Sequence, residues 1–338
     1  MMAEDGSRDT PSRAGTSRRH VLAAMALAPV PAVVATPAGA VAGGATVRGT
    51  SRGPAAPVPT TLSDWTAVAD ALGRPGEMKR VMYHTGLPRR DLVLISRGVL
   101  IKPALALGSH VSFVRYSDGA TLLMGDAVVT ERELQSFGDA LYEHGIERTA
   151  LHKHLLSQFP DVWWVHVHAY GHDPAAIARG LRAAFDRIGT PPPSPPAQAR
   201  PLDLDTAGID AAMGVRGVVD DGVYKSIFAR RETVTDGGRI LPPGLGSTTA
   251  VNFQPLGGGR AAVSGDCVMV ADEVQNVLGA LRRAGAELVE VHHHGLRDEP
   301  RLFFAHFWAA GDAVGLARGL RAAVDATNVA PVAAPDAG

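Results

Sequence analysis

Histidine is the residue type that offers chemistry in this sequence. Nine of its 13 histidines lie in two short windows. Both windows contain a His-x-His pair followed, after eleven residues, by a further His. The candidate ligands are His152, His154, His166 and His168 in the first window and His292, His294 and His306 in the second. Because imidazole nitrogen is a common metal ligand, the repeated spacing predicts a metal site in each window.

Strand geometry gives this spacing a meaning. Residues two apart on a strand share a face, whereas on a helix they diverge by about 200°. If each window folds as a hairpin about its proline, Pro160 or Pro300, four cross-strand pairs result. His154 then faces His166, His152 faces His168, His294 faces His306, and His292 faces Trp308. The hairpins would gather up to four imidazoles in the first window and three in the second.

Three histidines with an open water position are typical of catalytic zinc. Zinc is therefore the expected cofactor, and iron or copper would also accept imidazole ligands. The alternative is that the histidines only complete a sheet through hydrogen bonds. His293 and His172 are assigned this structural role, because His293 has the wrong strand parity and His172 falls in a predicted turn.

Other charged residues recur between the windows. Glu147 and Glu287 each lie five residues before a His-x-His pair and are candidate general bases. The alternative is that both are solvated carboxylates without a catalytic role. Asp126 and Asp266 each follow a glycine and could orient a ligand imidazole. The pairs Arg89-Arg90 and Arg230-Arg231 could clamp an anionic small-molecule ligand, although a solvated strand end is the simpler interpretation.

The windows belong to a unit that occurs twice. Matches at a spacing of about 140 residues include Gly125-Asp126 with Gly265-Asp266 and Glu133 with Glu273. We predict repeat domains at 62–190 and 204–328, joined by a proline-rich linker at 191–203. A signal peptide at 1–42, a flexible linker at 43–61 and a disordered tail at 329–338 complete the predicted organisation.

Each repeat is predicted to mix helices and strands. Short helices are expected at 65–72 and 209–213, and extended runs at 80–84, 92–96, 99–102 and 223–230. Asp118-Gly119 and Gly257-Gly258-Gly259 mark hairpin turns. Helices are expected from the capping box at Thr130 to Gly145, from 272 to 284, and after Asp173-Pro174. The predicted class is α+β, with two pseudo-symmetric copies of a mainly antiparallel sheet.

The N-terminus has the pattern of an export signal. Arg18-Arg19 precedes an apolar, alanine-rich run that ends in small-residue cleavage motifs, which indicates twin-arginine export to the cell envelope or medium. Pro29, Pro31 and Pro37 interrupt the run, so no transmembrane segment is expected. The net charge of -1 among 338 residues excludes a basic nucleic-acid footprint.

The sequence resembles a known family. The stretches Thr149–Leu156 and Val291–His306, together with Gly125-Asp126, Gly145-Ile146 and the duplication, look like the LppY/LpqO-like family of exported bacterial proteins. That resemblance implies the duplicated architecture and no defined activity. This chain lacks the cysteine that would anchor a lipoprotein. The histidine spacing is also similar, locally, to that of acetolactate decarboxylase, which implies a zinc lyase as an alternative.

Three functions remain open from the sequence. The first is an exported metal-dependent enzyme that acts on a small polar substrate. The second is a binding protein that holds metal, or a ligand through metal, without turnover. The third is a structural envelope protein whose histidines complete a sheet.

Overall fold

The computed structural model describes residues 53–194 and 201–332. The predicted signal peptide lies outside the described residues. The first repeat contains η1 (Leu62–Trp65), α1 (Thr66–Leu72), β1 (Glu77–Lys79), β2 (Met82–Pro88), β3 (Ile95–Ser96), β4 (Val99–Leu100), a π-helical turn η2 (Pro103–Leu107), β5 (Gly108–Arg115), β6 (Thr121–Thr130), α2 (Leu134–Glu143), β7 (Glu147–His152), β8 (Gln158–Phe159), β9 (Val162–Gly171) and α3 (Pro174–Phe185).

The second repeat follows the same order. It contains α4 (Thr206–Met213), β10 (Val218–Asp220), β11 (Val223–Arg230), β12 (Thr235–Asp236), β13 (Arg239–Ile240), β14 (Thr248–Gly257), β15 (Arg260–Met269), η3 (Ala271–Glu273), α5 (Val274–Arg283), β16 (Glu287–His292), β17 (Asp298–Glu299), β18 (Phe303–Asp312), α6 (Ala313–Asp325) and β19 (Val329–Pro331). The duplication and the α+β class are confirmed.

Each repeat is built on one large antiparallel sheet. The strand order is β1-β2-β5-β6-β9-β7 in the first repeat and β10-β11-β14-β15-β18-β16 in the second. Two small sheets, β4-β3-β8 and β13-β12-β17, stand beside them. The strands that carry the third histidine, β9 and β18, therefore lie next to the edge strands β7 and β16, which carry the His-x-His pairs.

Local sequence signals explain the main elements. The turn at Asp118-Gly119 joins β5 to β6, and Gly119 adopts a positive φ of 81° that suits glycine. Half of the predicted capping box forms, because the carboxylate of Glu133 accepts a hydrogen bond from the amide of Thr130 at 2.8 Å, while the α-helix itself begins at Leu134. Asp173 caps α3 through the amide of Ala176, with Pro174 in the first helical turn.

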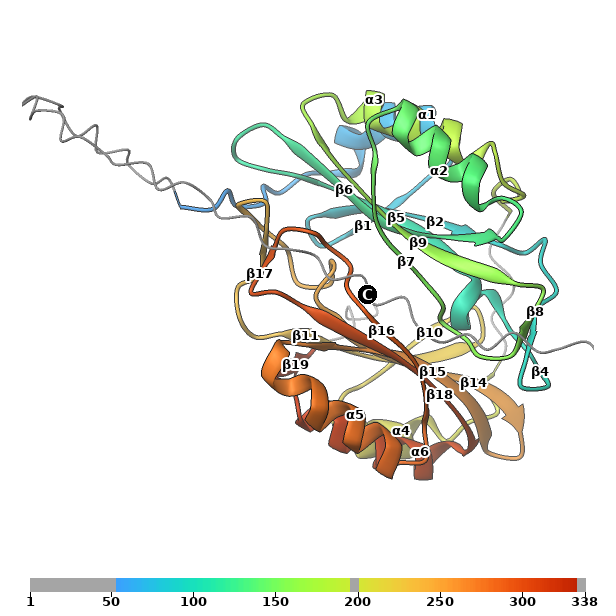
Figure 1. Cartoon of the computed structure of the whole chain (residues 1–338). Coiled ribbons are helices and arrows are strands. Elements are labelled where there is room, and N and C mark those ends of the chain that lie inside the picture. The colour runs from blue at the N-terminus through green and yellow to red at the C-terminus, as the bar shows by residue number, and fades with distance from the viewer. Residues whose placement is uncertain (1–52, 195–200, 333–338) are drawn as a thin grey trace, which may run out of the picture. The chain divides into compact units, whose positions relative to one another are not determined.

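The helices cover one face of each sheet (Figure 1), with α1, α2 and α3 on the first sheet and α4, α5 and α6 on the second. In the first repeat, Phe137 and Leu181 from the helices pack on Val165 and Val167 of β9 in one apolar cluster. The odd-numbered residues of β9 thus face the helices. The histidines at even positions consequently face the other way.

The faces without helices meet each other. Both repeats belong to one compact unit. An apolar cluster joins Leu105, Val128 and Trp164 of the first repeat to Ala262 and Trp308 of the second. Both faces of each sheet are therefore buried, which explains why nearly all of β6 is inaccessible to solvent.

The predicted hairpin register is wrong. In the first repeat, Ala150 pairs with His166 and His152 pairs with Trp164, with a bulge between Arg148 and Ala150. The second repeat has the same arrangement, in which Glu290 pairs with His306 and His292 with Phe304. The physical reason is that residues 153–161 do not form a simple turn. They contain β8, which leaves the large sheet and pairs with β3.

Two terminal segments are more ordered than expected. Ala55 and Pro57, assigned to a flexible linker, form bridges to Arg239 and Tyr116. Residues 329–331, assigned to a disordered tail, form β19 and pair with β11. Backbone hydrogen bonding to strand edges explains both corrections. The rest of the predicted tail, 333–338, and residues 195–200 of the proline-rich linker lie outside the described residues.

Candidate metal centre

Six histidines from both repeats converge where the two sheets meet. They are His152, His154 and His166 from the first repeat and His292, His294 and His306 from the second. The rings of His152 and His292 are stacked across the interface, with centroids 4.0 Å apart and an interplanar angle of 14°. The predicted windows therefore form one shared cluster instead of a separate site in each repeat.

The two His-x-His pairs have matching local geometry. His152 ends β7, and His154 lies just beyond it, with the two Nε2 atoms 2.9 Å apart. The corresponding Nε2 atoms of His292 and His294 are 3.2 Å apart. Two nitrogen ligands of a tetrahedral zinc ion would be separated by about 3.3 Å, given Zn–N bonds of roughly 2.0–2.1 Å. The pairs are thus spaced to bind one ion through both rings.

Aromatic side chains hold the second histidine of each pair. His154 is stacked on Trp164, with centroids 4.3 Å apart, and His294 is stacked on Phe304. Trp164 and Phe304 occupy matching positions in β9 and β18, opposite the ends of the edge strands. The stacking restricts the rotation of each imidazole, which preorganises its Nε2 atom.

An aspartate lies beside each pair, and Asp126 is buried while the side chain of Asp266 is 15% exposed. Asp126 on β6 is directly opposite His166, and Asp266 on β15 is directly opposite His306. Their Oδ2 atoms lie 3.5 Å and 3.2 Å from Nε2 of His154 and His294, respectively. Each repeat thus contributes three imidazoles and one carboxylate to the centre.

Burial and charge set the protonation of these groups. Burial, followed by the neighbouring imidazoles, holds the pKa of His152, His154 and His166 well below the usual value, so these rings are neutral near pH 7. Burial and then the charge of Asp266 raise the pKa of Asp126 well above its usual range. Burial also raises the pKa of Asp266 to about 6. A cation among these groups would favour ionised carboxylates.

Several buried polar atoms of the centre have no hydrogen-bond partner. They are Nδ1 of His152 and His292, Nε2 of His166 and His306, and Oδ1 of Asp126 and Asp266. Nδ1 of His306 lies 3.1 Å from the carbonyl oxygen of Gly265, so it can donate a proton there and leave Nε2 as a lone pair. Buried polar atoms are rarely left unpaired, and a metal ion bound to Nε2 of His166 and His306 would give these two nitrogens a partner.

Two groups of three histidines have ligand nitrogens within 4.8 Å of one another. One is His152, His292 and His306, and the other is His166, His292 and His294. Each group draws on both repeats, and His292 belongs to both. The arrangement can therefore hold metal only while the two repeats remain packed together.

His168, the remaining predicted ligand, lies outside these groups. Its Nδ1 atom is 3.2 Å from Oδ2 of Asp236 in the second repeat, and both side chains are 2% exposed. Tyr170 donates a hydrogen bond to the same carboxylate at 2.8 Å. The changed register places His168 opposite Glu147 at the start of β7, whereas His152 lies at the end of β7 opposite Trp164.

The predicted general bases lie away from the centre. Glu147 and Glu287 begin β7 and β16, whereas the His-x-His pairs are at the other ends of these strands. Glu147 accepts hydrogen bonds from Arg297, and Glu287 forms an ion pair with Arg97. Both carboxylates join the repeats at the surface instead of facing the imidazoles.

The predicted arginine clamps have structural roles. Arg89 is 1% exposed and pairs with Asp91 and Glu133 of its own repeat. Arg230 forms the matching network with Glu232 and Glu273. Arg90 is paired with Asp221, and Arg231 donates to the carbonyl oxygen of Val329. These guanidinium groups stabilise loops and caps instead of facing the histidine cluster.

Two residues that the sequence pattern did not single out hold the backbones of the His-x-His pairs. Glu290 accepts a hydrogen bond from the amide of Lys153 at 2.5 Å, between the two histidines of the first pair. Thr149 donates its hydroxyl proton to the carbonyl oxygen of His294 at 2.6 Å. The alternation Glu290-x-His292-x-His294 was the available signal for Glu290, because it places the carboxylate on the histidine face.

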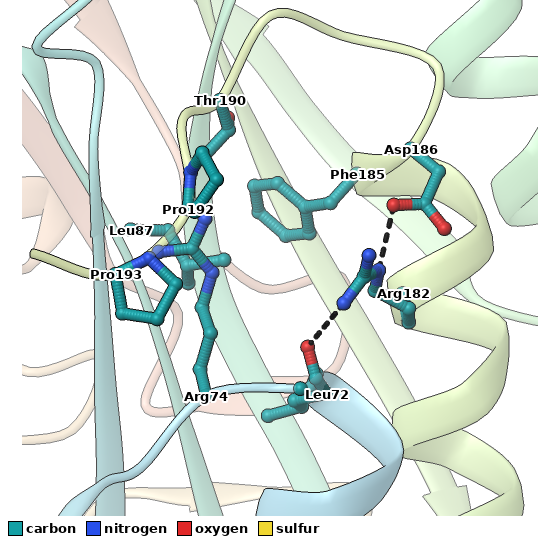
Figure 2. A pocket seen from close by; sticks show the side chains of 10 residues that line it. Leu72, Arg74, Leu87, Arg182, Phe185, Asp186, Thr190, Pro192 and Pro193 are labelled. Carbon is teal, nitrogen blue, oxygen red and sulfur yellow. Dashed lines mark hydrogen bonds and ion pairs between the residues drawn. The ribbon is translucent and has the colours of Figure 1, made fainter.

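A separate hollow of about 160 Å³ lies on the helical side of the first repeat (Figure 2). The residues that line it include Leu72, Arg74, Arg182, Thr190, Pro192 and Pro193. Arg182 donates to the carbonyl oxygen of Leu72 at 3.1 Å, and Arg74 donates to that of Pro191. These arginines cap the chain locally, and the histidines lie on the opposite face of the sheet.

The chain matches a protein family for which no activity is described. A family model described as "Domain of Unknown Function (DUF1259)" matches residues 66–187 and again 207–326. No curated protein matches the sequence. Over the described ranges 53–194 and 201–332, no helix is long and apolar enough to cross a membrane.

Two solved structures show a weak similarity. The trimeric bacterial microcompartment shell protein PduB is 13% identical, with 72% of this chain and 86% of that chain covered and a TM-score of 0.17. The double ringed trimeric shell protein MSM0271 from the RMM microcompartment is 13% identical, with 61% and 82% covered and a TM-score of 0.18. At these scores, neither similarity supports a structural or functional conclusion.

Proposed function

Since this chain belongs to the DUF1259 family, whose description states no activity, we propose a function from the site itself. The protein binds a divalent transition-metal ion in a centre shared by its two repeats. The observation that carries this proposal is the convergence of six imidazoles, with buried unpartnered nitrogens, from sheets of both repeats. Zinc fits the nitrogen and carboxylate ligand set, and iron or copper would accept the same imidazoles.

A bound metal ion would also crosslink the two repeats, because its ligands come from both of them. Each group of three histidines includes residues from both sides of the interface. Binding to the folded state alone stabilises a protein in proportion to the logarithm of the metal concentration. A chelator should therefore lower the melting temperature of the whole chain.

A catalytic role is the second candidate, and partial exposure of the centre favours it. The side chains of His294 and Asp266 are each 15% exposed, so solvent reaches one side of the cluster. A metal ion there could polarise a carbonyl group or activate water for a small polar substrate. The analogy with acetolactate decarboxylase is less well supported, because its ligand set was expected within one repeat and the observed groups cross the interface.

We also propose export through the twin-arginine route, on the basis of Arg18-Arg19 and the apolar run after them. The proposed placement in the LppY/LpqO-like family agrees with an exported, duplicated protein. Replacing both arginines by lysine should retain the protein inside the cell. Unchanged secretion of that variant would contradict this route.

The central test is metal content by mass spectrometry on protein purified without an affinity His-tag. Wild type should contain zinc, or take it up after chelation. His152→Ala/His154→Ala and His292→Ala/His294→Ala should each lose metal. The control is His172→Ala, because His172 is exposed on a turn. Wild-type protein that binds neither zinc, iron nor copper would overturn the proposal.

A further inference from the structure

The number of ligands in the centre exceeds what one ion can use. Six imidazoles and two carboxylates converge, whereas a protein-bound zinc ion is almost always four-coordinate. We propose that the centre holds two metal ions and that their ligands are crossed between the repeats. Each ion binds the His-x-His pair and the aspartate of one repeat, together with the strand histidine of the other. This inference rests on the proposed metal-binding function.

The first ligand set contains the pair from the second repeat. Nε2 of His294 lies 3.2 Å from Nε2 of His292 and 3.2 Å from Oδ2 of Asp266. The ring centroid of His166, from the first repeat, is 4.0 Å from the ring centroid of His294. The ligand nitrogens of these three histidines all lie within 4.8 Å of one another.

The second ligand set is related to the first by the duplication. Nε2 of His154 lies 2.9 Å from Nε2 of His152 and 3.5 Å from Oδ2 of Asp126. The ring centroid of His306, from the second repeat, is 3.9 Å from the ring centroid of His154. The crossing is therefore reciprocal, and each ion would bind residues of both sheets.

Burial favours two ions over one. A single ion among His152, His292 and His306 is the alternative, since their ligand nitrogens also lie close together. That ion would leave both aspartates and three histidines without a metal. Nε2 of His166 would then stay buried without a partner. Two ions divide the eight ligands into four and four, which matches tetrahedral coordination for both.

The first measurement is the stoichiometry of wild-type protein. Metal-free full-length chain is titrated with Co²⁺ and Zn²⁺, and the bound ions are counted by native mass spectrometry. Two tight ions per chain are expected. One ion per chain would overturn the inference and leave the proposed function intact, whereas no bound ion would overturn both.

The crossing is tested by two double variants with equal numbers of substitutions. His294→Ala/His166→Ala removes ligands from one set only, so one tight ion should remain. His294→Ala/His306→Ala removes a ligand from each set, so both ions should bind more weakly by at least about 100-fold, the upper end for losing even an outer-shell partner. The opposite pattern would show uncrossed ligation.

Folding of the variants is checked by circular dichroism and thermal melting. If a double variant fails to fold, the same pairs are replaced by glutamine, as His294→Gln/His166→Gln and His294→Gln/His306→Gln. In the crossed arrangement, the first variant weakens one ion and leaves the other bound, and the second variant weakens both ions. The reverse pattern would overturn the crossed arrangement.

Discussion

The interface between the repeats has two ends that occupy matching positions in the duplicated sequence, but their side chains differ. At one end, His168 and Tyr170 of the first repeat contact the buried carboxylate of Asp236. At the other end, Trp308 occupies the position that matches His168 and lies in an apolar cluster with Leu94 and other residues of the first repeat. One end is thus polar and hydrogen-bonded, and the other is apolar.

Between these ends, the two repeats remain alike. His152, His154 and His166 have counterparts at 292, 294 and 306, and Asp126 has its counterpart at Asp266. A metal centre that uses ligands from both repeats requires both halves to keep the same geometry. The flanking positions only need to pack, so either apolar contact or a satisfied polar network meets the requirement. The likeness at the centre and the difference at its two ends therefore indicate that side-chain geometry is constrained at the histidines and not at the flanking positions.

The largest effect is expected at the apolar end. Trp308→Ala should lower the free energy of unfolding by about 3–5 kcal/mol, because a large buried side chain would leave a cavity. Urea unfolding of the full chain measures this loss. Trp163→Ala is the control, since Trp163 is only half-buried. Equal losses in the two variants would mean that the apolar end does not hold the repeats together.

A smaller effect is expected at the polar end. Asp236→Ala leaves Nδ1 of His168 without its acceptor, and the hydroxyl of Tyr170 keeps only the backbone carbonyl of residue 236. Unpaired buried groups of this kind cost about 1–3 kcal/mol. In a double-mutant cycle, Asp236→Ala/His168→Leu should cost less than the sum of its single variants. Strict additivity would show that the pair is not energetically coupled.

The next comparison concerns the backbones of the two His-x-His pairs. Glu290 holds the first pair, whereas Ala150 occupies the matching position in the first repeat. Glu290→Ala should weaken metal binding about tenfold, the lower end for outer-shell partners, in a zinc titration against a competing chelator. Glu287→Ala on the same strand should leave affinity unchanged, because Glu287 pairs with Arg97 at the surface. Equal effects would contradict a positioning role for Glu290.

The smallest effect concerns acid stability of the two arginine networks. Burial alone would raise the pKa of Glu232, but hydrogen bonds from Arg230 and others outweigh it and lower the pKa to about 2. Burial likewise opposes the hydrogen bonds from Arg89 and nearby amides that lower the pKa of Glu133. The stabilisation is therefore complete above about pH 4.5 and is lost as the pH falls through the folded pKa.

Thermal melting between pH 7 and pH 2 tests this dependence. Glu232→Gln and Glu133→Gln should each lower the melting temperature modestly near pH 7, because the two carboxylates are 33% and 19% exposed and solvent screens their charge. The difference in melting temperature between each variant and wild type should shrink in acid. For Glu232→Gln, this difference should persist until about pH 2. Glu131→Gln, at an exposed position, is the control. A difference that grows in acid would reverse the assigned sign.

The sequence by itself determined the features that depend on neighbouring residues. The repeat, the turns at Asp118-Gly119 and Gly257–Gly259, and the cap at Asp173 were all predicted from local patterns. The alternation of His166 with Val165 and Val167 placed the histidines on one sheet face, because successive strand side chains point to opposite faces. The same argument placed the His-x-His pairs on extended segments.

Only the tertiary structure decided which histidines meet. The register of β7 on β9 depends on a bulge and on the departure of β8 to another sheet, and neither has a signature in the spacing. The contact of His166 with His294 joins residues far apart in sequence through the packing of two sheets. Residue spacing determines which faces carry ligands, but burial of the remaining sheet faces against each other brings those ligands together.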